Sequence, residues 1–270
     1  MLFLKEDVFI VFGSASDSVA FEPIQRALKE KKISCSVNVL SAHRTPKALE
    51  SALSKSKARL FVAGAGLSAA LPGVVASQTV KPVIGISCLG AFDGLDSFLA
   101  TVQMPPGVPV LALNVGEASE VARHAKNYFS GFEKIVLVNS LNSDLGPVQK
   151  AKDVFNQLKV KFAENFELEF SNPKHLYVVF VSLDSINQLP LTDSSVIVVP
   201  VKSNTSVVDA QNFFMAAKKN LFVGVNRGEN AALGAIQLFN LKGKLDKSLL
   251  SYRKEQAKKV LESNKLLQKK

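Results

Sequence analysis

The feature that most constrains this chain is an alternation of short β-branched apolar runs with longer amphipathic segments. The apolar runs are typical of buried strands and occupy 8–12, 34–40, 59–64, 82–87 and 108–115. Apolar residues at helical spacing mark the segments between them, at 21–32, 46–55, 67–78 and 117–129. This alternation predicts a parallel sheet with helices on both faces, a three-layer α/β fold. Ligands bind such sheets at the carboxyl ends of the strands.

The pattern begins again after residue 130, with the apolar run KIVLV at 134–138. Ser143-Asp144 then repeats Ser16-Asp17. Nearer the end of the chain, three residues of the first half recur at a constant offset of 112, namely Asn114, Gly116 and Glu117 as Asn226, Gly228 and Glu229. Self-similarity in this order indicates an internal duplication. We therefore expect two units, 1–130 and 131–270, with a helical tail at the end of the second.

The net charge of +10 is concentrated at the C-terminal end. Residues 241–270 hold ten Lys or Arg against three acids, a net of +7, which leaves about +3 for everything before them. A solvated helix face is the favoured interpretation of this tail over a binding patch. The rest of the chain lacks the mixed aromatic and basic clusters of single-strand binders, so we expect no nucleic-acid partner.

Cys35 and Cys88 are the only two cysteines, which excludes a disulfide framework and a cysteine zinc site. The most apolar stretch, 60–76, is short for a membrane span, and its glycines and Pro72 suit a strand, a turn and a packed helix better. The N-terminus has no signal-peptide cleavage pattern. We expect a soluble cytoplasmic protein with no membrane partner.

Three loops, each at the end of a predicted strand, carry the candidate site residues. The first is GSASD, Gly13 to Asp17. A glycine, two hydroxyls and a carboxylate between a strand and a helix can surround a phosphate with hydroxyls and helix amides. The same residues can equally serve as a plain helix cap. The motif alone does not decide between the two.

The second loop is SAHRTP, Ser41 to Pro46. An unperturbed histidine titrates near neutrality, so His43 can both give and take a proton. Arg44 offers a fork of donors to a phosphate. A helix-capping loop with a solvated His and Arg is the alternative, but histidine is rare in this chain and the loop shares a sheet edge with GSASD. His124 and His175 lack such neighbours, and we expect them at the surface.

The third loop is AGAGLSAALPG, Ala63 to Gly73, whose small residues permit a ligand or another backbone to approach closely. Gly64, Gly66 and Ala69 also match a dinucleotide-binding pattern. That match is weak, because it follows the third strand and no acid appears until Asp93, beyond the next strand.

Together these segments resemble the PurE family in order and spacing. The family pattern is a GSxSD loop, SAHRTP, AGAGxAAHLPG and a stretch containing DS and VQMP. This chain supplies the first three as described, followed by Asp96-Ser97 and 102–105, VQMP. The resemblance covers nearly all of 7–130, and four ordered motifs are far more specific than any one of them. The second unit keeps traces of the last family helix and tail but none of the catalytic motifs, so it is identified as a degenerate copy.

The resemblance implies a flavodoxin-like domain, duplicated in tandem, that acts as a 5-(carboxyamino)imidazole ribonucleotide mutase in de novo purine (IMP) biosynthesis. This isomerase moves a carboxylate from the exocyclic nitrogen to a ring carbon without metal, ATP or biotin. By the family's mechanism the carbamate loses carbon dioxide in a closed site and the ring carbon recaptures it. His43 matches the histidine that shuttles the proton. The residues matched to substrate binding are Ser14, Ser16, Asp17, Ser41, Arg44 and Gly66, with Ser14, Asp17 and Arg44 at the ribose phosphate end.

Two positions depart from the family pattern. Ala70 stands where the family has a histidine before LPG, and Ser18 replaces a tryptophan after GSxSD. His43 is therefore the only candidate proton carrier. Arg44 with Thr45-Pro46 favours the mutase over the related carboxylase, which uses free carbon dioxide. A non-catalytic nucleotide-binding scaffold is the other alternative, and it applies if Ala70 abolishes turnover.

The resemblance also implies self-association, because the family assembles as an octamer with active sites between subunits. Two units per chain would let four chains supply eight domains. We therefore expect a homotetramer with pseudo-octameric symmetry, in which only the first unit of each chain has a competent site.

Overall fold

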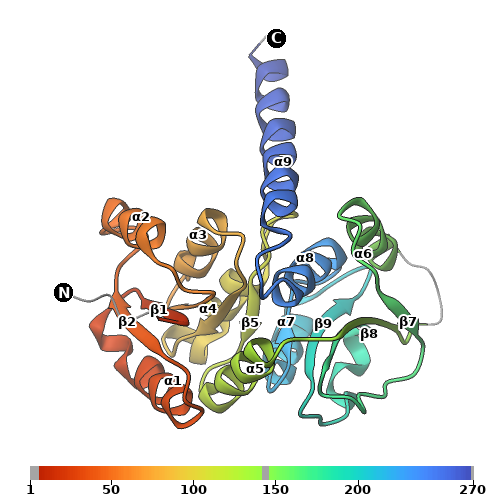
Figure 1. The fold of residues 1–270 in the computed structure, drawn as a ribbon, viewed down its shortest axis with the longest axis horizontal. Helices are drawn as coiled ribbons and strands as arrows, with labels where there is room; N and C mark the ends of the chain where they lie inside the picture. The colour runs from red at the N-terminus through yellow and green to blue at the C-terminus, as the bar shows by residue number, and fades with distance from the viewer. Residues whose placement is uncertain (1–5, 142–145, 269–270) are drawn as a thin grey trace.

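The computed structural model describes residues 6–141 and 146–268, which form an α/β protein (Figure 1). The strands are β1 (Val8–Phe12), β2 (Cys35–Val39), β3 (Leu60–Ala65), β4 (Val83–Ser87), β5 (Leu111–Leu113), β6 (Lys134–Asn139), β7 (Ala163–Asn165), β8 (His175–Ser182), β9 (Ser195–Val201) and β10 (Leu221–Phe222). The helices are α1 (Ser18–Glu30), α2 (Pro46–Lys55), α3 (Ala70–Gln78), α4 (Leu95–Val102), α5 (Ala118–Ser130), α6 (Gly146–Gln157), α7 (Val207–Ala216), α8 (Gly228–Phe239) and α9 (Asp246–Leu267). Three short 3-10 helices are η1 (Ala15–Asp17), η2 (Ala91–Gly94) and η3 (Leu183–Gln188).

All ten described strands belong to one sheet, in the order β2-β1-β3-β4-β5-β10-β9-β8-β6-β7. Each half has the same internal order, because β7-β6-β8-β9-β10 repeats β2-β1-β3-β4-β5. Neighbouring strands within each half are parallel. The halves join where Phe222 of β10 pairs with Ala112 of β5, and that contact is antiparallel. The parallel three-layer fold expected from the alternation is confirmed.

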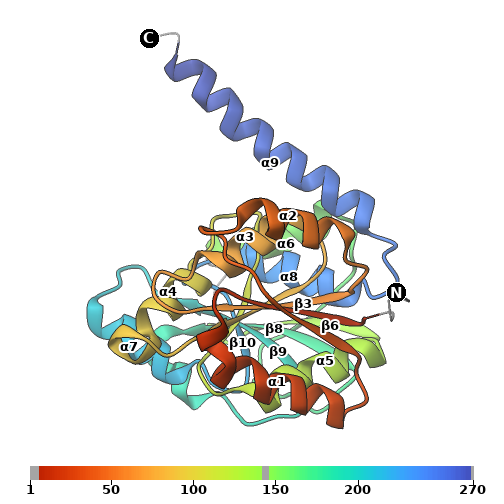
Figure 2. The same cartoon turned by 90° about the vertical axis from the view of Figure 1, so that its left-hand side faces the viewer.

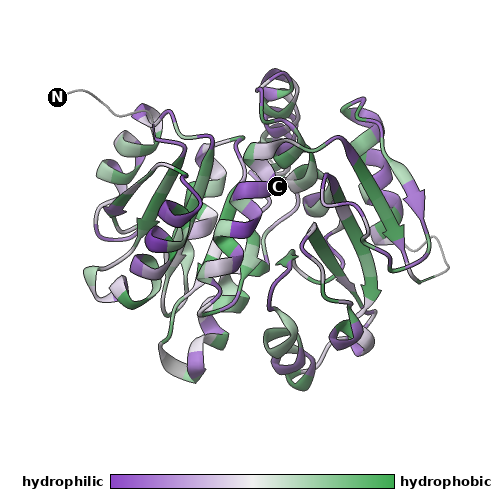
Figure 3. Cartoon of the chain, turned by 60° about the horizontal axis from the view of Figure 1, so that its bottom comes forward, coloured by the Kyte–Doolittle hydropathy of each residue, from purple (hydrophilic) through white to green (hydrophobic). Residues whose placement is uncertain are grey.

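Alternate side chains of each strand enter different cores, as the two-residue period of a strand requires. Val8, Ile10 and Phe12 of β1 belong to a core that also contains residues of α1, α5, α6 and α8. Phe9 and Val11 point to the opposite face, against α2 and α3. On that same face α4 and α7 meet through an edge-to-face pair, Phe98 with Phe213. Figure 3 shows the inner strands of both halves among the most hydrophobic parts of the chain.

The second half lacks helical cover at two crossovers. Residues 166–174, between β7 and β8, contain no helix, whereas α2 fills the corresponding crossover of the first half. The 3-10 helix η3 stands where α3 lies in the first half. Apolar side chains of these shorter segments, such as Leu168, Phe170 and Ile186, pack against the face of β8 and β9 that helices would otherwise cover.

Element boundaries differ from expectation at two places. The helix expected at 67–78 begins at Ala70, because Leu67 adopts a left-handed backbone (φ 57°) that a right-handed helix excludes. The strand expected at 108–115 shrinks to β5, since Pro109 has no amide to donate to a neighbouring strand.

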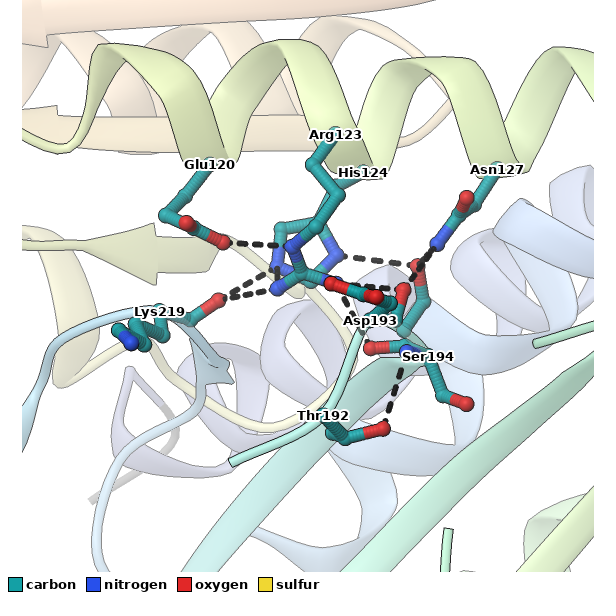
Figure 4. Close-up of polar contacts among 9 residues, drawn as sticks. Glu120, Arg123, His124, Asn127, Thr192, Asp193, Ser194 and Lys219 are labelled. Carbon is teal, nitrogen blue, oxygen red and sulfur yellow. Dashed lines mark hydrogen bonds and ion pairs between the residues drawn. The ribbon is translucent and has the colours of Figure 1, made fainter. Parts of the chain in front are cut away.

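His124 was expected at the surface, and this expectation is wrong: the residue is 1% exposed, at the junction of the two halves (Figure 4). Nε2 lies 2.8 Å from the Lys219 carbonyl oxygen, and Nδ1 lies 3.0 Å from the Ser195 hydroxyl. A carbonyl only accepts, whereas the Arg123 guanidinium, 3.1 Å from the same Nε2, only donates. The carbonyl contact is the shorter of the two, so we place the proton on Nε2, which leaves Nδ1 to accept from Ser195. Burial, with the neighbouring charge of Arg123, lowers the pKa of His124 to about 3. His175 is half-buried.

Arg123, the neighbour of His124 on α5, clamps the same junction (Figure 4). Its guanidinium donates to the carbonyl oxygens of Ser194 and Lys219, both at 2.7 Å, and of Asp193 at 3.0 Å. Its Nε pairs with the Glu120 carboxylate at 2.6 Å. Side chains of the first half thus satisfy carbonyl groups that precede β9 and β10.

The C-terminal helix α9 leaves the body of the protein (Figures 1 and 2). Leu249 and Tyr252 are buried at its base, and Arg253 donates to the carbonyl oxygen of Thr79 at 2.6 Å. Beyond Gln256 every described residue of the helix is exposed. Among the described helices, none is long and apolar enough to cross a membrane.

Candidate active site

The three predicted loops meet in one pocket of about 680 Å³. Strands β2, β1 and β3 are parallel neighbours, and Phe12 pairs with both Val39 and Gly64 at their carboxyl ends. The loops that follow these strands therefore converge. All seven residues assigned to the site from the sequence line this pocket: Ser14, Ser16, Asp17, Ser41, His43, Arg44 and Gly66.

The first loop both caps η1 and lines the pocket. Ser14 Oγ accepts from the Ser16 amide at 3.3 Å and from the Ser16 hydroxyl at 2.8 Å. The Asp17 carboxylate accepts from the Ser14 amide at 3.1 Å, which completes a capping box. Burial raises the pKa of Asp17 above its usual range, although the Ser14 amide and the charge of Arg44 act to lower it. The two alternatives for this loop are compatible.

The second loop is tied to the first through Arg44. Its guanidinium donates to the Gly13 carbonyl oxygen at 2.7 Å, while its amide donates to Ser41 Oγ at 3.1 Å. Thr45 closes the turn, because its hydroxyl accepts from the Ser41 amide at 2.8 Å. The His43 side chain is exposed in the pocket wall, and none of the described residues forms a hydrogen bond with its ring. It is free to meet a ligand.

Packing requires glycine at position 64, where the third loop begins. A Cβ on Gly64 would lie 2.2 Å from the Phe12 ring, so only glycine fits at this point of β3. Packing therefore accounts for the first glycine of the apparent dinucleotide pattern. Ala70, the first residue of α3, lines the pocket where the family resemblance places a second histidine. The pocket wall carries a methyl group there.

The fourth motif, Asp96-Ser97 with 102–105, lies outside the pocket lining and is held in place by other parts of the chain. Ser97 is buried, and its hydroxyl donates to the carbonyl oxygens of Cys88 and Gly94. The VQMP stretch is held by the second half, because the Asn230 amide donates to the Pro105 carbonyl at 2.9 Å. Neither Asp96 nor Ser97 lines the pocket.

Leu67 and Ser68 of the third loop also line the pocket, and so do Leu89 and Gly90, which belong to none of the three predicted loops. Leu89 and Gly90 follow β4, the neighbour of β3, so their position after a strand end was the available signal. Two apolar side chains of this lining are strongly exposed, Leu67 at 67% and Leu89 at 64%.

The matching edge of the second half is built differently. Lys202, just after β9, pairs with Asp184 of η3 at 2.6 Å and with Asp209 of α7 at 2.8 Å. The hydrogen bonds from Lys202 and Ser206 hold the pKa of Asp209 at about 2. Two of the three segments that these ion pairs join, those directly after β8 and β9, have first-half counterparts after β3 and β4 that line the pocket. Ser143 and Asp144, the expected counterparts of Ser16 and Asp17, lie outside the described residues.

No group of three or more His, Cys, Asp or Glu side chains that could hold a metal ion occurs in ranges 6–141 and 146–268. Cys35 and Cys88 are free thiols. Burial, followed by the charge of Asp17, raises the pKa of Cys88 to about 12, so this thiol is not an ionised nucleophile at neutral pH.

Comparison with known proteins identifies the first half. A sequence model described as AIR carboxylase matches residues 7–134. An N5-carboxyaminoimidazole ribonucleotide mutase from Methanocaldococcus jannaschii is 46% identical over 115 residues, which are 43% of this chain and 73% of the relative. A protein of the same name from Mycobacterium tuberculosis is 46% identical over 115 residues, 41% of this chain and 66% of that protein.

A yeast relative, the phosphoribosylaminoimidazole carboxylase of Saccharomyces cerevisiae, is 37% identical over 134 residues, 48% of this chain and 24% of that protein. These matches agree with the four ordered motifs and with the pocket that three of them form. The chain therefore belongs to the AIR carboxylase family, the PurE family of the sequence resemblance.

Proposed function

We propose that this protein is a 5-(carboxyamino)imidazole ribonucleotide mutase of purine biosynthesis, with its active site in the first half. The observation that carries the proposal is the convergence of all seven candidate residues on one pocket with a single histidine. Two relatives that bear the mutase name, at 46% identity, support the same reaction.

In this proposal the ribose phosphate end of the substrate lies between the first two loops. Arg44 uses one donor on the Gly13 carbonyl, which fixes the guanidinium and leaves its other donors for phosphate. The hydroxyls of Ser14, Ser16 and Ser41 line the same pocket. Asp17 accepts from the Ser14 amide and so holds the first loop in shape.

His43 carries the proton. The bond between the exocyclic nitrogen and its carboxylate breaks, and the nitrogen accepts a proton as carbon dioxide departs. The ring carbon then attacks carbon dioxide and gives up its own proton. One imidazole can donate the first proton and accept the second, so no net proton is consumed. A pocket that excludes water would keep carbon dioxide next to the ring carbon.

The substrate pair tests the reaction. We expect conversion of the carbamate substrate, and no comparable conversion of aminoimidazole ribonucleotide with bicarbonate. The reverse preference would assign the carboxylase activity, the activity that the yeast relative's name states. Tight binding of the nucleotide without turnover of either pair would assign a non-catalytic scaffold, the result expected if Ala70 removes an indispensable group.

We also propose that residues 131–270 are a degenerate copy of the first unit and that four chains assemble as a pseudo-octamer. The repeated strand order supports the duplication. Exposed apolar side chains in the pocket lining and on the outer part of α9, including Leu67, Val260 and Leu261, support contact with other chains. Light scattering should give about 116 kDa, four times 29.1 kDa, with one nucleotide site per chain. A monomer, or two sites per chain, would contradict the proposal.

The cytoplasm is the compartment we propose for this activity. Its two free thiols, Cys35 and Cys88, suit a reducing environment. Fractionation of cells that express a tagged chain would test the assignment.

A further inference from the structure

A second pocket, of about 720 Å³, lies apart from the candidate active site and shares no lining residue with it. Its walls come from four places in the chain: the end of α5, the start of β6, the turn between α6 and β7, and the turn between α8 and α9. Its size falls within the range of small-molecule sites, about 300–1,000 Å³.

The wall of this second pocket is strongly basic. Five lysines line it, namely Lys134, Lys159, Lys161, Lys242 and Lys244. Within the described part of the chain, none of these five has an ion-pair partner. The only acid in the lining is Glu133, and its carboxylate pairs with Lys174 at 2.8 Å. All five side chains are exposed, so their ammonium groups are available to neutralise a bound polyanion.

The lining of the same pocket also contains aromatic side chains. Phe132, Phe162 and Phe239 line it, and all three are only partly buried. Phe162 is held against the buried Phe155, with ring centroids 4.9 Å apart. An inorganic anion would leave these rings unused, whereas a flat heterocycle can stack on them.

We propose that this pocket binds a nucleoside polyphosphate, with its base against the phenylalanines and its phosphates on the lysines. The combination of a stacking surface with several separate ammonium groups fits a ligand that has both parts. The volume fits one nucleotide rather than a stretch of nucleic acid. The inference does not depend on the reaction proposed for the first half, because the two pockets are built from different residues.

ATP, tripolyphosphate and adenosine are the probes, titrated calorimetrically against the full chain at about physiological ionic strength, where screening by salt is realistic. We expect one ATP per chain, bound at least roughly tenfold more tightly than either fragment. Equal affinity for tripolyphosphate and ATP would overturn the base contact. Preferential binding of an RNA oligomer over ATP would overturn the mononucleotide assignment.

Matched variants locate the site. The double variant Lys159→Ala/Lys161→Ala should raise the dissociation constant of ATP by roughly tenfold or more. Lys254→Ala/Lys259→Ala removes the same charge from the exposed α9 and should change it less than about twofold. Phe162→Leu should weaken the binding of ATP and leave the affinity for tripolyphosphate unchanged. If Arg44→Ala instead abolishes ATP binding, ATP occupies the active site and the proposal fails.

Discussion

The two halves of this sheet have the same strand order, but the loops at their strand ends differ. In the first half, loops of glycine, serine and one histidine leave an open pocket between β1, β2 and β3. In the second, Lys202 joins Asp184 and Asp209 across the described ends of β8 and β9. The cores of both halves remain closely packed and apolar. The comparison teaches that the same strand order and apolar cores can persist with different loops, whereas a site depends on a few loop residues that packing does not require.

The largest expected effect comes from the histidines of the two halves. His43→Ala should lower mutase turnover by about a hundred- to ten-thousandfold, because a general acid–base group contributes that much. His175→Ala, in the second half, should leave turnover within about twofold. The measurement is kcat with the carbamate substrate. Retained turnover in His43→Ala would place the proton carrier elsewhere and break the contrast between the halves.

The next largest effect, on substrate affinity, comes from comparing Arg44 in the first half with Lys202 in the second. Arg44→Ala should weaken substrate binding by roughly ten- to a hundredfold, the loss of a charge-assisted phosphate contact of about 1.5–3 kcal/mol. Lys202→Ala should leave substrate affinity unchanged, since its ammonium is engaged by Asp184 and Asp209. Equilibrium binding of the nucleotide product measures both. Equal weakening by the two variants would mean that both halves contribute to one site.

A third comparison tests whether the junction of the two halves keeps His124 buried in solution. The folded-state pKa of His124, about 3, lies below the unfolded value of 6.5, so the unfolded chain binds a proton that the folded chain does not. Stability should fall as pH drops through this window, by up to about 1.4 kcal/mol per pH unit. His124→Gln should remove the part of the pH dependence of the unfolding free energy that comes from His124. The part that comes from carboxylates should remain. Identical slopes in parent and variant, measured by denaturant unfolding, would show that the junction is open or His124 accessible.

Much of the first half could be predicted, because its signals are local. The run at 8–12 became β1 without change, and Pro46 marks the start of α2, where a missing amide is harmless. The convergence of three loops followed from parallel strand order. The loop containing Leu89 and Gly90 was missed, since nothing polar distinguishes it in the sequence.

The junction could not be predicted, because it joins distant parts of the chain. Nothing near Ala112 indicates an antiparallel neighbour at Phe222. His124 did carry a usable signal. It shares the buried stripe of α5 with Val121, Ala125 and Tyr128, at helical spacing. A buried histidine needs a hydrogen-bond acceptor for its ring N–H. The acceptor here is the carbonyl oxygen of Lys219, which comes from the other half.

The continuous sheet also determines how the active site can move. Three residues, 131–133, separate α5 from β6, and the junction is fixed by Arg123, so no flexible linker lets one half swing against the other. Opening and closing of the pocket must therefore come from its own loops. We expect this movement in the two turns that line the pocket after β3 and β4, at Leu67 and at Leu89. Amide hydrogen exchange should be fast in those turns and slow across β5 and β10.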